Sequence, residues 1–333
     1  MARRISFVLA LICVVAVSPF ARADEPDADP LATFDVPLPT LGGTQFWADQ
    51  LIFGSWRVQR NTVTGESRLL DGDNFRHATG TFETCRDRLI AISREREMPA
   101  LTSRVVLVLH GLGRSRGSMA GLADYLAENP DWTVMTLGYP TTQGSIADHA
   151  QTLAGVVDHF DGVSEVNFVA HSLGNLVIRR WMHDIAERAD TSPPDWRLGR
   201  FVMLGPPNHQ PTLGRLLTPL DKDGLIVGQA ARQLGIGWSE VADTLATPPC
   251  QFGIIAGGTG KRGYNPLIAG DDDGVVGVES ARLTGARDFR LVRAEHSFIM
   301  NDDEVQRLTR RFLETGWFET PDSAQPIVAD ASE

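Results

Sequence analysis

Short apolar, β-branched runs alternate with amphipathic helical stretches from residue 104 to residue 314, and this alternation restricts the fold more than any other feature. The run from Val105 to Leu109 is continuously apolar, as in a strand buried on both faces. Strands that alternate with helices form a mostly parallel sheet with helices on both faces. The sequence therefore predicts an α/β fold. The predicted strands are 104–109, 132–137, 166–170, 200–204, 252–256 and 289–292, and the predicted helices are 115–128, 145–160, 173–187 and 302–314.

The N-terminus has the layout of a secretory signal peptide. Arg3 and Arg4 precede the apolar run Phe7 to Val17, and Ala21-Arg22-Ala23 places small residues at the spacing of a cleavage site. The apolar run is short for a membrane-spanning helix. We therefore expect residues 1–23 to be removed and the mature protein to be secreted or periplasmic.

The whole chain is acidic, with 42 Asp and Glu against 31 Lys and Arg and a formal net charge of −11. The predicted signal peptide contains arginines and no acidic residue, so its removal makes the chain more acidic. This charge disfavours nucleic acids and anionic membrane surfaces as partners. It leaves apolar lipid substrates and a lipid interface open, and it says nothing about the oligomeric state.

The regions outside the alternating pattern differ in composition. Residues 24–40 are rich in Asp, Pro and Ala and predict a flexible leader. Residues 41–100 predict an extension of short strands and one polar helix, without a motif of clear chemistry. We place the α/β domain at 101–320 and a disordered tail at 321–333. Two cysteines follow the predicted cleavage site, Cys85 and Cys250, and both a disulfide and two free thiols fit them.

A long segment, 206–250, interrupts the alternation and is rich in Gly and Pro. Insertions in such folds lie at the carboxyl ends of the strands, where ligands bind. The segment predicts a cap or lid over an acyl pocket, with ordinary helical packing as the alternative. Its candidate lining residues are Leu213, Leu216, Leu217, Leu225, Ile226 and Trp238.

Two serines match the small-x-Ser-x-Gly pattern of a nucleophile elbow, a sharp turn between a strand and a helix. Ser115 lies six residues after its strand, behind a glycine-rich loop, so we expect it to cap the next helix. Ser172 directly follows the strand 166–170 and directly precedes a helix, so we expect it to be the nucleophile. The turn also places the backbone N–H of Leu173 at a helix N-terminus, where it can stabilise an oxyanion.

The loop His110-Gly-Leu-Gly113 follows the first strand of the alternating region, at the place where a second oxyanion donor is expected. The donor would be the backbone N–H of Leu112. His110 and His171 are nearby, and we expect structural roles for both.

A serine nucleophile needs a base with a pKa near 7 and a carboxylate that orients the base. Among the histidines downstream of Ser172, His183 lies on a helix and His209 follows a strand. His296 follows the last strand and precedes the closing helix, so it is the predicted base.

The acid is expected after the strand 252–256, where Asp271, Asp272 and Asp273 follow one another. An Asp-Gly turn before Val275 should bury Asp273 and leave its two neighbours solvated. Asp273 is therefore the predicted acid, with Glu295 as the alternative. The three acids fit no EF-hand, and 257–261 lacks two positions of a phosphate loop, so no metal or cofactor is expected.

These motifs together resemble those of bacterial lipases and esterases of the α/β-hydrolase superfamily, over roughly residues 104–315. They are HGLG at 110–113, AHSLG at 170–174, DGVV at 273–276 and EHS at 295–297. The resemblance implies a Ser-Asp-His triad that acts on small-molecule or lipid esters without a cofactor. Ala170 departs from the glycine of most members, although some lipases have alanine there. A thioesterase, an amidase or an acyltransferase would use the same triad, and a non-catalytic binding protein is the alternative from another class.

Overall fold

The computed structural model describes residues 38–39, 44–188, 197–209 and 228–329. The predicted signal peptide and nearly all of the predicted leader lie outside these residues. Within the described part, no helix is both long and apolar enough to cross a bilayer.

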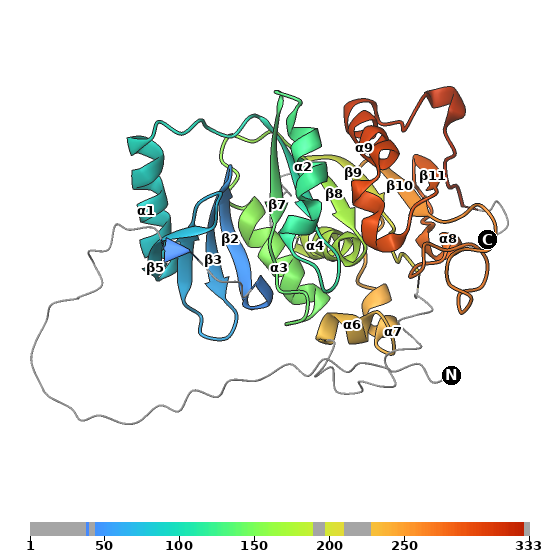
Figure 1. Cartoon of the computed structure of the whole chain (residues 1–333), viewed down its shortest axis with the longest axis horizontal. Helices are drawn as coiled ribbons and strands as arrows, with labels where there is room; N and C mark the ends of the chain where they lie inside the picture. The colour runs from blue at the N-terminus through green and yellow to red at the C-terminus, as the bar shows by residue number, and fades with distance from the viewer. Residues whose placement is uncertain (1–37, 40–43, 189–196, 210–227, 330–333) are drawn as a thin grey trace, which may run out of the picture. The chain divides into compact units, whose positions relative to one another are not determined.

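Six parallel strands form the larger sheet, in the order β11-β10-β9-β8-β6-β7 (Figure 1). Because β6 lies between β7 and β8, the chain crosses to opposite sides of β6, and ligands bind at such a switch point at the carboxyl ends of the strands. Leu109 pairs with Ala170, and His171 pairs with Leu204, so three strands end level with one another. The strands are β6 (Arg104–Leu109), β7 (Trp132–Leu137), β8 (Glu165–His171), β9 (Leu198–Leu204), β10 (Phe252–Gly257) and β11 (Asp288–Val292).

Helices cover both faces of this sheet, which confirms the predicted α/β architecture. Leu107 belongs to one buried cluster and its neighbours Val106 and Val108 belong to another, because successive side chains of a strand point to opposite faces. The first cluster includes side chains of α3 (Ile146–Val157) and α4 (Leu173–Arg188). The second includes side chains of α2 (Ala120–Ala127) and α9 (Asp303–Thr315).

Polar caps determine where several helices begin. Ser145 and Asp148 form a reciprocal capping box at the start of α3. Asp302 accepts hydrogen bonds from the first turn of α9. Ser115 occupies the cap position of a 3₁₀ helix, η2 (Arg116–Met119), but its side chain makes no capping hydrogen bond. The helix predicted from residue 115 is therefore divided into η2 and α2.

The N-terminal extension forms a second, antiparallel sheet in the order β1-β5-β4-β3-β2. Its strands are β1 (Leu38–Pro39), β2 (Trp47–Phe53), β3 (Trp56–Asn61), β4 (Ser67–Leu70) and β5 (Phe75–Gly80), with the 3₁₀ helix η1 (Thr44–Phe46) before β2. Helix α1 (Phe82–Glu95) packs on this sheet through Cys85, Leu89 and Ile92. The N–H of Asp49 in β2 donates to the carbonyl of Gly138 (2.9 Å), so the extension joins the main domain just beyond β7.

The C-terminal segment corrects the prediction of a disordered tail from residue 321. The segment begins with a 3₁₀ helix, η5 (Pro321–Ser323). The N–H of Gln325 then donates to Asp288 Oδ1 (2.9 Å). The N–H of Ile327 donates to the carbonyl of Ala286 (3.0 Å). These bonds fasten residues 321–329 beside β11. The polar composition of the segment gives no sign of these hydrogen bonds in the sequence.

Cys85 and Cys250 are free thiols, so the disulfide alternative does not hold. Cys85 is buried on the face of α1 that packs on the N-terminal sheet, and Cys250 lies before β10, beside the core of the main sheet. Burial raises the pKa of the Cys85 thiol to about 11 and that of Cys250 to about 12, so both are protonated and unreactive near neutral pH.

Candidate active site

Ser172 occupies a sharp turn between β8 and α4. Its φ of +52° is a left-handed conformation that is costly for a residue other than glycine. Gly174 explains the close passage of α4, since a Cβ there would lie 2.9 Å from Leu109 Cβ and 3.0 Å from the carbonyl oxygen of His110. Ala170 is fully buried in β8, so a methyl group fits at that position.

Ser172, His296 and Asp273 form an unbroken chain of hydrogen bonds. His296 Nε2 lies 2.9 Å from Ser172 Oγ, and His296 Nδ1 lies 2.7 Å from Asp273 Oδ2. The carboxylate can only accept, so Nδ1 donates to it and Nε2 accepts from the serine hydroxyl. The structure therefore brings together the three residues predicted from the sequence, all of them less than 10% exposed (8%, 7% and 2%).

Backbone groups hold the carboxylate of Asp273 in place. Its Oδ1 accepts from the N–H groups of Val275 (3.0 Å) and Val276 (2.7 Å). Its own carbonyl accepts from the N–H of His296 (2.8 Å). The acid and the base are thus joined through both side chain and main chain. Glu295, the alternative acid, is exposed.

Of the two preceding aspartates, which the sequence suggested were solvated, Asp271 is partly exposed and Asp272 is not. Asp272 is fully buried, and its Oδ1 accepts from the N–H groups of Tyr264, Asn265 and Gly274. The half-buried Asp271 accepts from the N–H groups of Thr259 and Gly260. The prediction is wrong for Asp272, because the loop 258–265 folds over it. The carboxylates of both aspartates also occupy N–H groups that a phosphate loop would need.

The loop after β6 lies directly against the nucleophile. A Cβ on Gly111 would lie 3.0 Å from Ser172 Cβ and 2.8 Å from His171 Nδ1. Leu112 comes next in this loop, and Leu173 is the first residue of α4, so its N–H has no partner within the helix. The N–H of Gly113 donates to Thr141 Oγ1 (2.9 Å), which anchors the loop to the segment after β7.

The two other histidines near the site have structural positions. His110 stacks on Tyr139 with a centroid distance of 4.3 Å, and burial lowers its pKa to about 4. His171 donates from Nε2 to the carbonyl of His296 (2.9 Å). Burial, followed by the neighbouring His296, holds the pKa of His171 well below its ordinary value, so both rings are neutral near pH 7.

Two glycines that the sequence analysis missed make room for the acid and the base. A Cβ on Gly205, which has a φ of +50°, would lie 3.1 Å from both Asp273 Oδ2 and His296 Nδ1. A Cβ on Gly257 would lie 2.8 Å from Asp273 Cβ. Their signal in the sequence is a glycine at or just after the end of a predicted strand.

Gln45 of the N-terminal extension was also missed. Its side-chain amide donates to the carbonyl of Arg114 (3.1 Å) and accepts from the N–H of Thr142 (3.2 Å). Arg114 in turn donates to the carbonyl of Ser297, beside the base (2.7 Å). The extension, which had no predicted role, therefore supports the loops around the site.

The predicted cap is described only in part. Leu213, Leu216, Leu217, Leu225 and Ile226 lie outside the described residues, so the lid stays a prediction. The described part contains α6 (Gln229–Gln233) and α7 (Trp238–Ala242), and Trp238 packs against the core of the main sheet.

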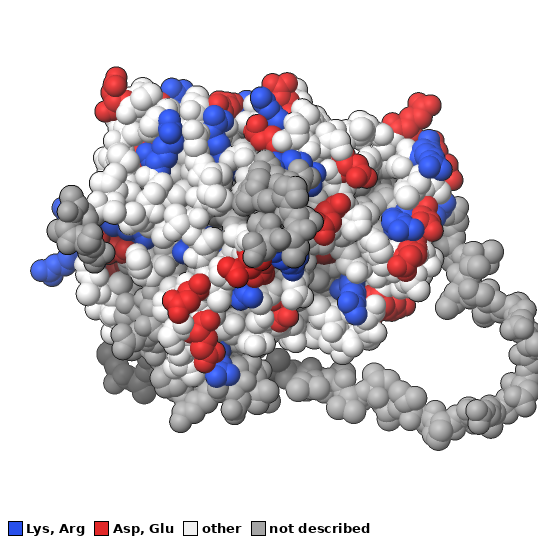
Figure 2. All heavy atoms as spheres, turned by 180° about the vertical axis from the view of Figure 1, so that it is seen from behind, with Lys and Arg blue, Asp and Glu red and all other residues white. Residues whose placement is uncertain are grey.

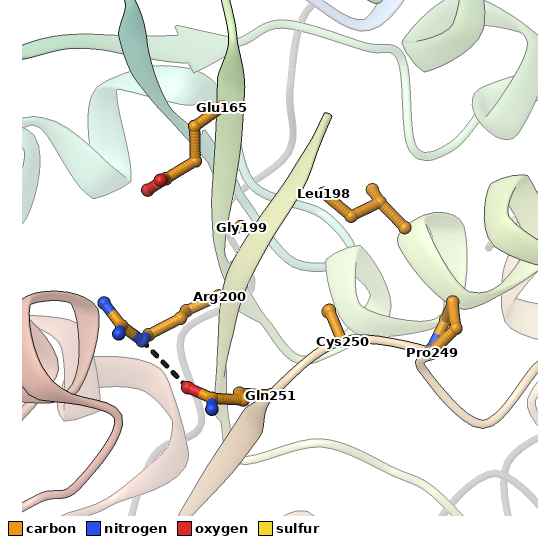
Figure 3. A pocket seen from close by; sticks show the side chains of 7 residues that line it. All are labelled: Glu165, Leu198, Gly199, Arg200, Pro249, Cys250 and Gln251. Carbon is orange, nitrogen blue, oxygen red and sulfur yellow. Dashed lines mark hydrogen bonds between the residues drawn. The ribbon is translucent and has the colours of Figure 1, made fainter. Parts of the chain in front are cut away.

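A cavity of about 630 Å³ lies at the amino ends of β8 and β9. Figure 3 shows the side chains that line it. The cavity is lined in part by Glu165, Leu198 and Arg200, and Arg200 Nε donates to Gln251 Oε1 (3.0 Å). The serine turn follows the opposite, carboxyl end of β8. This cavity is therefore separate from the hydrogen-bonded triad.

Charged side chains are interspersed on the face seen in Figure 2, where the described residues form no broad basic area. This distribution agrees with the overall acidic charge. It offers no electrostatic footprint for nucleic acid on that face.

No family model and no curated protein match the chain. Solved structures match it at low identity. A gene product of Listeria innocua is 18% identical over 68% of this chain and 98% of its own, with a TM-score of 0.46. A putative hydrolase from Agrobacterium vitis is 15% identical over 63% of this chain and 87% of its own, with a TM-score of 0.46.

The phospholipase PlaB from Legionella pneumophila is 18% identical over 54% of this chain and 45% of its own, with a TM-score of 0.44. The assignment of the fold therefore rests on the topology of the chain itself. A central parallel strand leads through a strained serine turn into a helix, and the next strand in space carries the neighbouring loop over that turn. By this topology the chain has the α/β-hydrolase fold.

Proposed function

We propose that the protein is a serine hydrolase that cleaves carboxylic esters through an acyl-enzyme intermediate. The observation that carries this proposal is the hydrogen-bonded series from Ser172 through His296 to Asp273. A hydroxyl becomes nucleophilic near neutral pH when an oriented base accepts its proton.

In the first half of the proposed cycle, Ser172 Oγ attacks the ester carbonyl and His296 Nε2 takes the proton. Asp273 stabilises the imidazolium that forms. The backbone N–H groups of Leu112 and Leu173 donate to the oxyanion of the tetrahedral intermediate. Each such donor contributes about 3 kcal/mol to the stability of the transition state in comparable sites.

The second half releases both products. His296 donates its proton to the leaving alcohol, which leaves an acyl group on Ser172. A water molecule then gives a proton to His296 and attacks the acyl carbonyl, and His296 returns that proton to Ser172 Oγ as the bond to the acid breaks. Every proton that is transferred in this cycle passes through His296.

Small-molecule or lipid esters are the proposed substrates. The same residues would serve a thioesterase, an amidase or an acyltransferase. Initial rates on p-nitrophenyl esters of increasing chain length, on the matching thioesters and on the matching anilides separate these classes. We expect the esters to be cleaved fastest, and preference for the thioester or the anilide would reassign the substrate.

An active-site probe tests the nucleophile without knowledge of the substrate. The protein is treated with a fluorophosphonate and its intact mass is measured, for wild type, Ser172→Ala and Ser115→Ala. Ser115 matches the same sequence pattern and lies outside the triad, so its variant is the matched control. We expect one adduct on wild type and on Ser115→Ala, and none on Ser172→Ala.

The opposite result has a defined meaning. If folded wild type is not labelled, even after detergent is added to open a covering segment, the catalytic proposal fails and the binding-protein alternative takes its place. An adduct that persists on Ser172→Ala would assign the nucleophile to another residue.

We also propose that the mature protein is exported. The layout of residues 1–23 supports this proposal. Mass analysis of the protein recovered outside the cytoplasm should give a chain that begins at Asp24. Recovery of the full-length chain from the cytoplasm alone would contradict export.

A further inference from the structure

A cavity of about 330 Å³ lies where the N-terminal sheet meets the segments that follow β6 and β7. This volume is at the small end of the range for ligand pockets, about 300–1,000 Å³. Its lining includes Trp47, Gln59, Arg68, Arg116, His110 and Tyr139. No residue of the Ser172–His296–Asp273 series lines it, so it is distinct from the proposed catalytic centre.

Two arginines line this cavity with only neutral side-chain partners. Arg68 on β4 is 8% exposed, lies 3.9 Å over the ring of Trp47 and donates from Nε and Nη2 to Gln59 Oε1 (3.1 and 2.8 Å). Arg116 in η2 donates to the side-chain carbonyl of Asn74. Within the described ranges, no carboxylate forms an ion pair with either guanidinium.

The carboxylate of Asp49 attracts both guanidiniums, but its single charge is also shared with Arg57 and cannot balance all three. Its Oδ2 accepts from Arg57 (2.8 Å) and from the N–H of Gly138 (2.6 Å), and its Oδ1 accepts from Gln59 (2.8 Å). Asp49 therefore forms its ion pair with Arg57. Arg68 and Arg116 remain as two cations in one cavity without an ion pair of their own, and the charge of the buried Arg68 is costly unless an opposite charge accompanies it.

Burial lowers the pKa of both Arg68 and Arg116 to about 10, so both stay charged at neutral pH. His110, which is 1% exposed, also lines the cavity, and its Nε2 has no hydrogen-bond partner among the described residues. The half-buried Trp47 supplies an aromatic wall. The cavity thus combines two cations that have no ion pair of their own with an aromatic wall, which is the composition of a small-molecule site.

We propose that this cavity binds a small molecule through an oxyanion, a phosphate or a carboxylate, held between Arg68 and Arg116. A guanidinium matches the geometry of these groups with two parallel hydrogen bonds. The rest of the ligand would contact Trp47. The site does not depend on the proposed esterase reaction, because it shares no residue with the triad.

Titration calorimetry of the whole protein tests this site with inorganic phosphate, glycerol 1-phosphate and acetate as probes. We expect saturable binding, stronger for glycerol 1-phosphate than for inorganic phosphate because it also contacts the walls. Arg116→Gln should weaken binding at least tenfold. Arg68→Gln should do the same, and thermal melting of each variant shows whether it is folded.

Arg76→Gln is the matched control. Arg76 is close enough to Arg68 to repel it electrostatically, but it does not line the cavity. The variant loses the same charge, so we expect less than a twofold change in affinity. Equal weakening in Arg76→Gln would show general charge attraction and would overturn the site.

Two further experiments are needed. One shows whether the bound phosphate belongs to a lipid headgroup or to a free ligand, and the other separates this proposal from the catalytic one. Vesicles of phosphatidylcholine with and without phosphatidic acid test a lipid headgroup, whereas the soluble probes test a free ligand. Ser172→Ala should bind the probes like wild type, so a failed esterase proposal leaves the site intact. If no probe and no vesicle binds, or if binding survives in both arginine variants, the proposal is wrong.

Discussion

His171 Nε2 donates a hydrogen bond to the backbone carbonyl of His296 over 2.9 Å, so the residue before the proposed nucleophile holds the main chain of the proposed base. Both rings are buried, with centroids 4.7 Å apart. The elbow and the histidine loop come from segments far apart in the sequence. This bond makes His171 a positioning residue for the Ser172–His296 contact.

We expect His171→Phe to slow fluorophosphonate labelling of Ser172 on the order of tenfold, which corresponds to one lost hydrogen bond of about 1.4 kcal/mol. His171→Gln should recover part of the rate, because its amide can donate to the same carbonyl. His183→Gln, at a half-exposed position on α4, is the control. Unchanged labelling kinetics in His171→Phe would remove this positioning role.

Asp273→Asn tests the acid. The amide can donate to His296 Nδ1, which favours the ring tautomer that cannot accept from Ser172. We expect kcat on a p-nitrophenyl ester to fall on the order of 10⁴-fold, as in the corresponding change in a serine protease. Glu295→Gln removes the neighbouring exposed carboxylate and should leave kcat unchanged. A loss in Glu295→Gln with little effect of Asp273→Asn would exchange the two assignments.

Gly205→Ala tests the space around the acid and the base. The added methyl group would lie 3.1 Å from Asp273 Oδ2 and His296 Nδ1, so we expect a loss of activity on the order of tenfold or more. Both this variant and Gly162→Ala place alanine at a positive φ, which costs about 1–2 kcal/mol of stability. Nothing lies within 4 Å of a Cβ on Gly162. Activity measured beside thermal melting should therefore fall in Gly205→Ala alone.

The sequence could predict the parts of the site that depend on local order. Ser172 stands between a strand and a helix without an intervening loop, and His296 stands between the last strand and the last helix, so topology alone brings both to one edge. Asp273 was identified by its Asp-Gly turn, and the structure buries it. Its role in catalysis stays a proposal that the variants above test.

Contacts through space could not be predicted in this way. Gln45 and Arg114 are 69 residues apart, and nothing in either local sequence signals their hydrogen bond. Asp272 looks like a surface residue, yet the loop 258–265 supplies N–H groups that allow its burial. The segment 321–329 is polar, yet it is attached to the domain. The buried carboxylate of Asp288 accepts hydrogen bonds from the backbone N–H groups of Phe318 and Gln325.

Buried neutral histidines make stability depend on pH. His149 on α3 is 2% exposed, and burial lowers its pKa to about 4, from an ordinary value of about 6.5 in the unfolded chain. Between these pH values His149 is therefore protonated in the unfolded chain and neutral in the folded chain. The free energy of unfolding should fall as the pH drops from about 6.5 to about 4, by about 3 kcal/mol for this residue.

His149→Phe removes this titration and keeps a ring against Tyr139, whose centroid lies 5.1 Å from that of His149. His149 Nε2 has no hydrogen-bond partner among the described residues, so the substitution should lower the stability little at neutral pH. Urea denaturation at pH 7.5, 5.5 and 4.5 should show a shallower loss of stability in His149→Phe than in wild type. His183→Phe, at a half-exposed position, should follow the wild-type curve. Parallel curves for wild type and His149→Phe would mean that His149 does not titrate in this range, because only a difference in proton binding between the folded and unfolded chains produces the slope.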